Sequence, residues 1–401
     1  MAVEIDEDGF EVEVGKEYED NFDESAEYNV NIKVIGVGGG GCNALNHMAK
    51  LGIKDPNSDD DVSVEYIAVN TDVPSLKTLN KSLMRRVQIG RKCLKGRGAG
   101  GRPEVAAEAA REDKETIQQC LEGAALVFIS AGMGGGTGTG AAPVIAEIAQ
   151  EMGILTVGVV TKPFAFEREQ KMNQAMKGIE EMRKHVDALL IIPNQRLLQL
   201  NEKQLTFPQA FAMVDDVLYR SVKIISDMVN KTAFMNTDFS DLCTIIQNAG
   251  DAHIAIGTGS GDKKVEDAVQ QVVNSPLLET SIANAGRLLV NITISSDLLL
   301  SDVDEAMSKI TEVACPGAQI ISGANYNTGD VKDTIIISVI ATCFSDLKTS
   351  SGAAKGDFGG DDQVIKTTTA GSLGDFITST IGSDDGSDGF SDLEKIFRSK
   401  K

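Results

Sequence analysis

Two glycine-rich segments carry residue types and spacings that could bind phosphate. The longer segment, residues 132–140, reads Gly-Met-Gly-Gly-Gly-Thr-Gly-Thr-Gly and follows the apolar run 125–131. Such a run is typical of a buried parallel strand. Residues 141–149 have a helical pattern, with Pro143 tolerated in the first turn. Because a glycine loop between strand and helix presents backbone N–H groups to an anion, the segment predicts a phosphate-binding loop.

The second segment begins at Gly36 and has the spacing Gly-x-Gly-x-x-Gly, again between a predicted strand and a helix. Two such loops favour a nucleotide with several phosphates, since a dehydrogenase needs one loop for its pyrophosphate. Neither loop contains lysine, and the chain has no Gly-x-x-x-x-Gly-Lys-Ser/Thr pattern. We therefore expect a cradle of backbone N–H groups, with the hydroxyls of Thr137 and Thr139 as further donors. A bound cation would neutralise part of the phosphate charge.

Alternating strand and helix patterns would position these loops. This βαβ rhythm predicts an α/β fold with a doubly wound, mostly parallel sheet. A long helix pattern over 208–230, about 35 Å at 1.5 Å per residue, joins this unit to a smaller α/β unit. In the first unit we predict strands over 31–37, 64–70, 125–131, 154–160 and 188–192, and helices over 103–121 and 167–185. In the second we predict helices over 265–273 and 303–315, and strands over 288–294, 318–325 and 334–341.

Composition limits the class of protein. The 401 residues are enough for two domains, and no apolar stretch approaches the roughly 20 residues of a membrane span. The acidic N-terminus has no apolar core of a signal peptide. Six dispersed cysteines indicate reduced thiols in a cytoplasm, and the three histidines form no metal cluster. The net charge of −21 disfavours binding to duplex nucleic acid.

Several motifs of the chain carry a family resemblance. Residues 134–140 resemble the signature loop of the tubulin/FtsZ superfamily, and residues 31 to about 344 are similar to the FtsZ family of bacterial cell-division GTPases. The matching stretches are 35–41, 69–72, 98–100, 161–164, 192–194 and 275–279. The resemblance implies a tubulin-like fold that binds GTP or GDP with Mg²⁺. The implied organisation is a disordered acidic tail (1–29), a GTP-binding domain (30–206), a central helix (207–231), a C-terminal activation domain (232–345), a disordered linker (346–390) and a partner-binding peptide (391–401).

The resemblance also implies which residues contact the nucleotide. For the phosphates these are Gly39, Gly40, Gly41, Cys42, Asn43, Ala99, Gly100, Gly136, Thr137 and Gly138.

The ribose would contact Glu167, with Lys171 where the family usually has arginine; spacing alone equally allows a surface ion pair between the two. Guanine would be selected by Asp215, because a carboxylate accepts from N1–H and the 2-amino group. The adjacent Asp216 is the alternative, otherwise a helix-surface or interface acid.

Catalysis is assigned by the resemblance to the loop that follows the long helix, where Asn236 would position and Asp238 and Asp241 would activate the attacking water. These residues lie a helix length of about 35 Å from their own nucleotide and cannot reach it. The resemblance implies that they act on the next subunit of a head-to-tail filament. A helix cap at Asp238 or Ser240 is the structural alternative.

Partners and alternative functions complete the prediction. The peptide 391–401 would bind a membrane-tethering division adaptor at midcell, or be a solubilising tail. We expect no nucleic-acid partner and no direct insertion into a membrane. Two other classes stay open: a dehydrogenase using Asp72 as its ribose acid, and a filament protein that binds GTP without hydrolysing it.

Overall fold

The structure is a computed structural model. It describes residues 2–5, 11–14, 30–52, 64–198, 206–230, 239–275, 282–295, 299–326 and 333–344. Within the predicted tail 1–29 it places two short strands, β1 (Ala2–Ile5) and β2 (Glu11–Val14), which pair antiparallel. The rest of that tail, the linker 346–390 and the peptide 391–401 lie outside the described residues. The disorder predicted for the tail and the linker, and the partner binding predicted for the peptide, therefore stay predictions.

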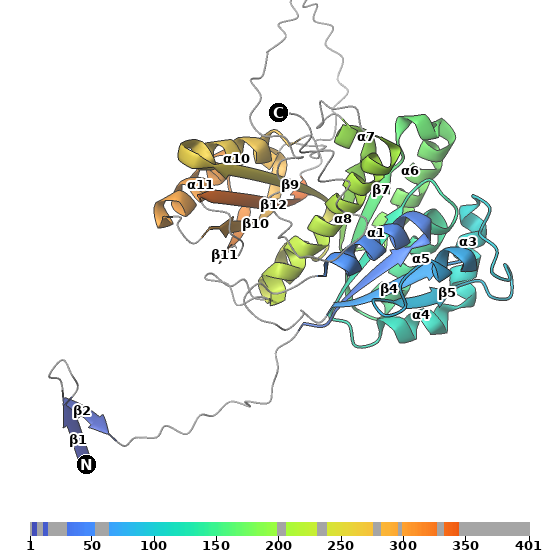
Figure 1. Cartoon of the computed structure of the whole chain (residues 1–401), viewed down its shortest axis with the longest axis horizontal. Helices are drawn as coiled ribbons and strands as arrows, with labels where there is room; N and C mark the ends of the chain where they lie inside the picture. The colour runs from blue at the N-terminus through green and yellow to red at the C-terminus, as the bar shows by residue number, and fades with distance from the viewer. Residues whose placement is uncertain are drawn as a thin grey trace, which may run out of the picture.

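A ten-stranded sheet runs through the molecule in the order β11-β10-β12-β9-β8-β7-β6-β3-β4-β5 (Figure 1). The strands from β3 to β8 pair in parallel, which confirms the predicted doubly wound sheet. Strand β5 was not predicted, because its four residues include two arginines and show no apolar pattern. The strands are β3 (Ile32–Val37), β4 (Val64–Asn70), β5 (Arg85–Gln88), β6 (Leu126–Gly132), β7 (Leu155–Lys162) and β8 (Ala188–Pro193).

Helices cover both faces of this sheet. Val34 and Phe128 face one core with helices α1 and α8, whereas their neighbours Ile35 and Ile129 face a second core with α3, α4, α5 and α6. This alternation follows from the period of two along a strand. The helices are α1 (Gly38–Leu51), α2 (Val73–Lys77), α3 (Pro103–Glu112), α4 (Lys114–Leu121), α5 (Thr137–Glu151), α6 (Glu169–Arg183), α7 (Asn194–Leu197) and α8 (Phe207–Asn230).

The single helix predicted over 103–121 is wrong: α3 ends at Glu112 and α4 begins at Lys114. Asp113 between them has φ −105° and ψ 26°, outside the helical region. Its carboxylate accepts a hydrogen bond of 2.7 Å from the Gly90 N–H, which ties the break to the neighbouring loop. Since that contact spans 23 positions of sequence, local helix propensity could not reveal it.

In the C-terminal unit, helices α10 and α11 pack on a four-stranded part of the same sheet. Its strand β9 was not predicted, because glycines interrupt its apolar pattern. Gly257 and Gly259 let α10 pack directly on the strand: an added Cβ at either would collide with the carbonyl oxygen of Ala268 or Lys264. The elements are α9 (Phe239–Ile246), β9 (Gly250–Ser260), α10 (Lys264–Val273), β10 (Ala285–Ile294), α11 (Leu300–Val313), β11 (Gln319–Tyr326) and β12 (Thr334–Phe344).

Backbone hydrogen bonds between two strands join the two units into one sheet. Strand β9 pairs in parallel with β8 over Ala188–Gly250, Leu189–Asp251 and Leu190–Ala252. Beside this register, Arg183 at the end of α6 forms a two-pronged ion pair with Asp251, with N–O distances of 2.8 and 3.1 Å. Helix α8 runs between the units in Figure 1. Among the described residues, none of the helices combines the length and apolar character that a membrane span requires.

Candidate functional site

The two glycine-rich loops lie in direct contact at the carboxyl edge of the sheet. Strands β3 and β6 are neighbours, with Val37 opposite Ala131; helix α1 begins directly after β3, and α5 begins after the short loop that follows β6. Gly38 has a φ of +72°, and a Cβ there would lie 2.7 Å from the Gly138 nitrogen. Two helix N-termini therefore converge on one point, which is the arrangement that binds an anion through backbone N–H groups.

The glycines of these loops divide into two kinds. At Gly138, an added Cβ would lie 2.5 Å from the carbonyl oxygen of Gly132, so this glycine permits close packing of backbone segments. At Gly39 and Gly135, an added Cβ would meet nothing within 4 Å, and both residues are exposed. The exposed glycines leave their backbone open on the side where a ligand would sit.

A third loop closes the site on the side of α3. Gly100 and Gly101 both have positive φ, and a Cβ at Gly136 would lie 3.1 Å from Ala99 and from the backbone nitrogens of Gly101 and Arg102. The predicted residues Ala99, Gly100 and Gly136 are thus brought together.

A glutamine that the sequence analysis missed fixes this arrangement. The Gln174 amide on α6 donates to the carbonyl oxygens of Gly101, Gly134 and Gly135, at 3.1, 3.3 and 2.8 Å. It therefore ties the third loop to the loop before α5. A lone glutamine in a helix gives no sequence signal for such a role.

The two threonines of the loop before α5 differ in their hydrogen bonds. The Thr139 hydroxyl is buried and accepts a hydrogen bond of 2.8 Å from the Gly134 N–H, so it stabilises the loop itself. Because the oxygen accepts in this contact, the O–H of Thr139 can still donate, and its predicted role as a phosphate donor stays a prediction. The Thr137 hydroxyl lies 2.8 Å from that of Thr71 at the end of β4, at the start of α5.

Cys42 faces away from the cradle. Its thiol is buried and donates to the carbonyl oxygens of Gly36 and Val69, at 3.4 and 3.6 Å. Burial raises the pKa of the Cys42 thiol to about 12, so the group is neutral. Of this predicted residue, the backbone N–H is the part left for a ligand. The next residue, Asn43, is exposed.

Glu167 and Lys171 form the surface ion pair that their spacing allowed. The Lys171 ammonium lies 2.9 Å from one Glu167 oxygen, and the other accepts from the Phe164 N–H at 3.1 Å. The carboxylate thereby caps the short helix η1 (Ala165–Glu167) that follows β7.

The two candidate guanine-binding acids differ in their surroundings. Asp216 pairs with Arg220 at 2.7 Å, and both side chains are largely buried. Asp215 is half-buried, and within the described part of the chain its carboxylate has no hydrogen bond or ion pair. Burial raises the pKa of Asp215 from its ordinary value of 3.8 to about 7. A desolvated carboxylate without a partner is a candidate ligand-binding group.

An aromatic group beside Asp215 was also missed. Phe211 lies one helical turn before Asp215, is 42% exposed, and packs edge-to-face on Phe164 with ring centroids 5.3 Å apart. Phe166 and Phe207 extend the cluster and are more exposed. The sequence contains a signal for this aromatic cluster, because paired phenylalanines occur at 164/166 and 207/211.

The predicted catalytic acid Asp241 lies at the opposite edge of the sheet. It is exposed in the first turn of α9, which leads into β9. Because Gly250 pairs with Ala188, the first residue of β8, this end of β9 marks the amino edge of the sheet. The other two predicted residues, Asn236 and Asp238, lie outside the described residues. The fold does not bring Asp241 to its own glycine loops.

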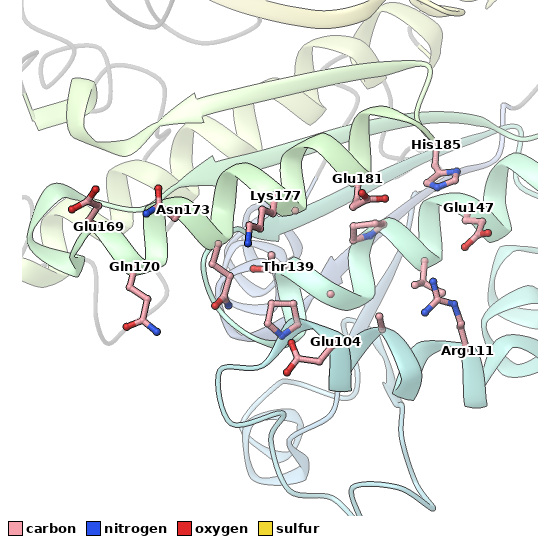
Figure 2. A pocket seen from close by; sticks show the side chains of 17 residues that line it. Glu104, Arg111, Thr139, Glu147, Glu169, Gln170, Asn173, Lys177, Glu181 and His185 are labelled. Atoms are coloured by element: carbon pink, nitrogen blue, oxygen red, sulfur yellow. The ribbon is translucent and has the colours of Figure 1, made fainter.

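A separate pocket of about 840 Å³ lies on the outer side of α5, between α3 and α6 (Figure 2). Glu104 and Glu181 line it together with Arg111 and Lys177, so charges of both signs face the space. This mixed lining is unlike the open backbone cradle at the carboxyl edge.

Comparisons with known proteins agree with this geometry. The model described as "Tubulin/FtsZ family, GTPase domain" matches residues 31–202, and "FtsZ family, C-terminal domain" matches residues 250–345. The structure "FtsZ dimer, empty (M. jannaschii)" is 34% identical, with a TM-score of 0.72, over 79% of this chain and 89% of that chain. The chain belongs to the tubulin/FtsZ family. It is accordingly a GTPase that binds guanine nucleotide, with the fold of the cytoskeletal GTPases.

More distant members share the fold. A GTPγS-bound protofilament of CetZ2 from Haloferax volcanii is 20% identical, with a TM-score of 0.64, over 78% of this chain and 92% of that one. GDP-bound CetZ1 from the same organism is 18% identical, with a TM-score of 0.67, over 79% of this chain and 96% of that one.

The dehydrogenase alternative required Asp72 to bind a ribose. Here the Asp72 carboxylate caps α2 by accepting from the N–H of Ser75 at 3.0 Å.

Proposed function

We propose that this protein polymerises head-to-tail into filaments that form the division ring at the septum, and that it hydrolyses GTP between subunits. The observation that carries the proposal is the separation of two half-sites. The glycine cradle lies at the carboxyl edge of the sheet, and Asp241 lies exposed at the amino edge. Stacking subunits head-to-tail would join the two halves, and a heterologous contact of this kind generates an open filament.

Within this site, the backbone N–H groups at the starts of α1 and α5 bind the phosphates. Phe211 offers its exposed face to the guanine ring, and Asp215 accepts from the N1–H and 2-amino groups. Glu167 and Lys171 would contact the ribose. Asp241 of the neighbouring subunit, with Asn236 and Asp238, positions and activates the attacking water.

Mg²⁺ fits this donor set as an ion carried by the phosphates. No group of three or more His, Cys, Asp or Glu that could hold a metal occurs in the part of the chain that the structure describes. Magnesium is commonly bound by substrate phosphates and water with few protein ligands. It would neutralise phosphate charge in a cradle without lysine.

Two features of the relatives support assembly and division. The GTPγS-bound CetZ2 structure is a protofilament, and the FtsZ C-terminal domain model matches residues 250–345. We also propose that the protein acts in the cytoplasm at midcell. There the peptide 391–401 would bind a membrane-tethering adaptor.

A concentration series tests the assembly-dependent mechanism. The rate of phosphate release per subunit is expected to be low below a threshold protein concentration and to rise steeply above it, because each complete site needs two molecules. Light scattering after GTP addition should rise at the same threshold. A rate per subunit that is constant across the series would contradict the proposal.

Asp215→Asn is expected to weaken GTP binding about tenfold to hundredfold at pH 8, since hydrogen bonds to a charged acceptor are lost. With the pKa of Asp215 at about 7, the fraction of ionised acceptor rises between pH 6 and 8. The affinity of the unchanged protein should rise over this interval more than that of the variant. Isothermal titration measures both.

The phosphates of GTP also titrate near neutral pH, and the comparison with the variant cancels their contribution. Inosine triphosphate, which lacks the 2-amino group, should bind the unchanged protein more weakly than GTP and should bind the variant about as well as GTP.

The stability of the free protein gives a second test. Ionising the half-buried Asp215 carboxyl lowers the stability of the folded protein as the pH rises from its ordinary pKa of 3.8 to about 7. Raising the pH through this window should therefore lower the free energy of unfolding more in the unchanged protein. Equal pH profiles for both proteins would remove Asp215 from the base site.

A further inference from the structure

One stretch of this acidic chain is strongly basic. Residues 73–103 contain nine lysines and arginines and no acid, although the whole chain has a net charge of −21. We call these side chains the basic strip. They are Lys77, Lys81, Arg85, Arg86, Arg91, Lys92, Lys95, Arg97 and Arg102.

The side chains of the basic strip are exposed and form no ion pair in the part of the chain that the structure describes. Two acids lie close by; both carboxylates accept from backbone N–H groups, and Glu112 also interacts electrostatically with Lys92. The Glu112 carboxylate accepts from the N–H groups of Lys92 and Cys93, and Asp113 accepts from Gly90. The positive charge of the strip is therefore available to a partner.

The strip lies along an open sheet edge. Strand β5 is the last strand of the sheet and pairs on one side with β4 (Figure 1). Beside it, Lys77, Arg86 and Arg91 line a shallow pocket of about 270 Å³. An exposed edge offers unpaired backbone groups that a further strand can bind, while side chains provide specificity. The surface thus fits an extended acidic peptide.

The chain itself contains such a peptide. Residues 1–29 hold twelve acids against one lysine, and include the strand segments β1 and β2, whose sequences alternate valine and glutamate in part. The segment joins the body at Val30, before β3, and β5 lies two strand spacings away, about 10 Å. Fifteen residues, 15–29, separate β2 from Val30 and can span up to about 50 Å.

We propose that the acidic segment 1–29 docks on the basic strip of its own subunit, along β5, and shields the strip from other polyanions. Charge complementarity and reach both favour this occupant over an external one. A tethered segment has an effective concentration in the millimolar range, whereas the chain's net charge repels nucleic acids and anionic membranes.

Zero-length carbodiimide cross-linking tests the proposal on the full chain, because it joins carboxylates directly to lysine amines. Without nucleotide, carboxylates of residues 1–29 are expected to link to Lys77, Lys81, Lys92 and Lys95, and to do so within one molecule when labelled and unlabelled protein are mixed. The yield should fall strongly at about 1 M salt, where charges are screened beyond about 3 Å. Links spread evenly to distant lysines such as Lys177, or formed between molecules, would overturn the proposal.

Matched charge variants sharpen the test. The triple variant Arg85→Glu, Arg86→Glu, Arg91→Glu should lose these links by roughly fivefold or more, because several exposed ion pairs are lost together. The control Lys50→Glu, Lys177→Glu, Lys263→Glu changes the net charge equally outside the strip and should keep them. Circular dichroism checks that both fold, and a strip variant that keeps its links would overturn the proposal.

A second measurement distinguishes external partners. A variant with the acids of 1–29 changed to their amides should bind single-stranded DNA or phosphatidylglycerol vesicles more tightly than the unchanged protein, because the strip is uncovered. If the unchanged protein binds either one equally tightly, the strip is open to nucleic acid or membrane and the proposal fails.

Discussion

Asp241→Ala protein is expected to bind GTP and to assemble with the unchanged protein, yet to release phosphate about 10²–10³-fold more slowly. The reason is geometric. Asp241 is exposed at the amino edge of the sheet, and the glycine cradle lies at the carboxyl edge of the same sheet. Removing the carboxylate therefore leaves the molecule's own nucleotide site intact and, in the proposed mechanism, removes a general base from the site of its neighbour. Sedimentation and phosphate release on the same samples measure both properties.

Glu266→Ala provides the matched control. Glu266 is also an exposed acid in the first turn of a helix of the C-terminal unit, α10, so its loss costs a similar helix-dipole interaction. This control should keep its turnover.

A mixture then shows whether Asp241 acts between molecules. Asp241→Ala protein, which has an intact cradle, should regain turnover when mixed with Asp215→Asn protein, which has an intact Asp241. Normal turnover by Asp241→Ala protein alone would exclude the catalytic role, and a co-sedimenting mixture without any gain would exclude its action across the interface.

Gly138→Ala is expected to lower the free energy of unfolding by about 1–3 kcal/mol and to abolish most GTP binding. The added methyl group would lie 2.5 Å from the carbonyl oxygen of Gly132 and 3.5 Å from that of Val37. Both are backbone atoms at strand ends, so no side chain can turn aside to relieve the clash. The start of α5 must then move away from the start of α1, which opens the cradle. Urea denaturation and nucleotide titration measure the two effects.

Gly135→Ala is the control for this prediction. Gly135 belongs to the same loop, but a Cβ there meets nothing within 4 Å. The variant should unfold at the same urea concentration as the unchanged protein, or slightly higher, because alanine restricts the unfolded chain. If Gly138→Ala were as stable as Gly135→Ala, the close packing of the two loops would not be a constraint on the fold.

Most of the sheet could be predicted from sequence because its strands are buried on both faces and read as apolar runs. Strands β5 and β9 could not. The first is a short edge strand with two arginines, and the second contains glycines that serve packing against α10. In both, tertiary contacts decide the conformation and local propensity does not.

For the site, spacing located both glycine loops, but it could not divide glycines that pack from glycines that face a ligand. That division depends on backbone atoms from other segments, as at Gly138 and Gly132. The role of Gln174 could not be predicted for the same reason, because it depends on carbonyl oxygens of two other loops. The sequence alone could favour Asp215 over Asp216 as the candidate guanine-binding acid. Arg220 stands four residues after Asp216, and this is the spacing of a helical ion pair, so Asp216 has a predictable partner.

The register between β8 and β9 determines how this chain can be dissected. A cut between the central helix and α9 separates two units that look independent in the sequence, yet it would open the middle of one sheet. One fragment would expose the edge of β8 beside buried Leu189 and Leu190, and the other would expose β9. Uncovered edges with apolar side chains recruit other copies and aggregate. The two halves are therefore expected to remain soluble only when they are produced together.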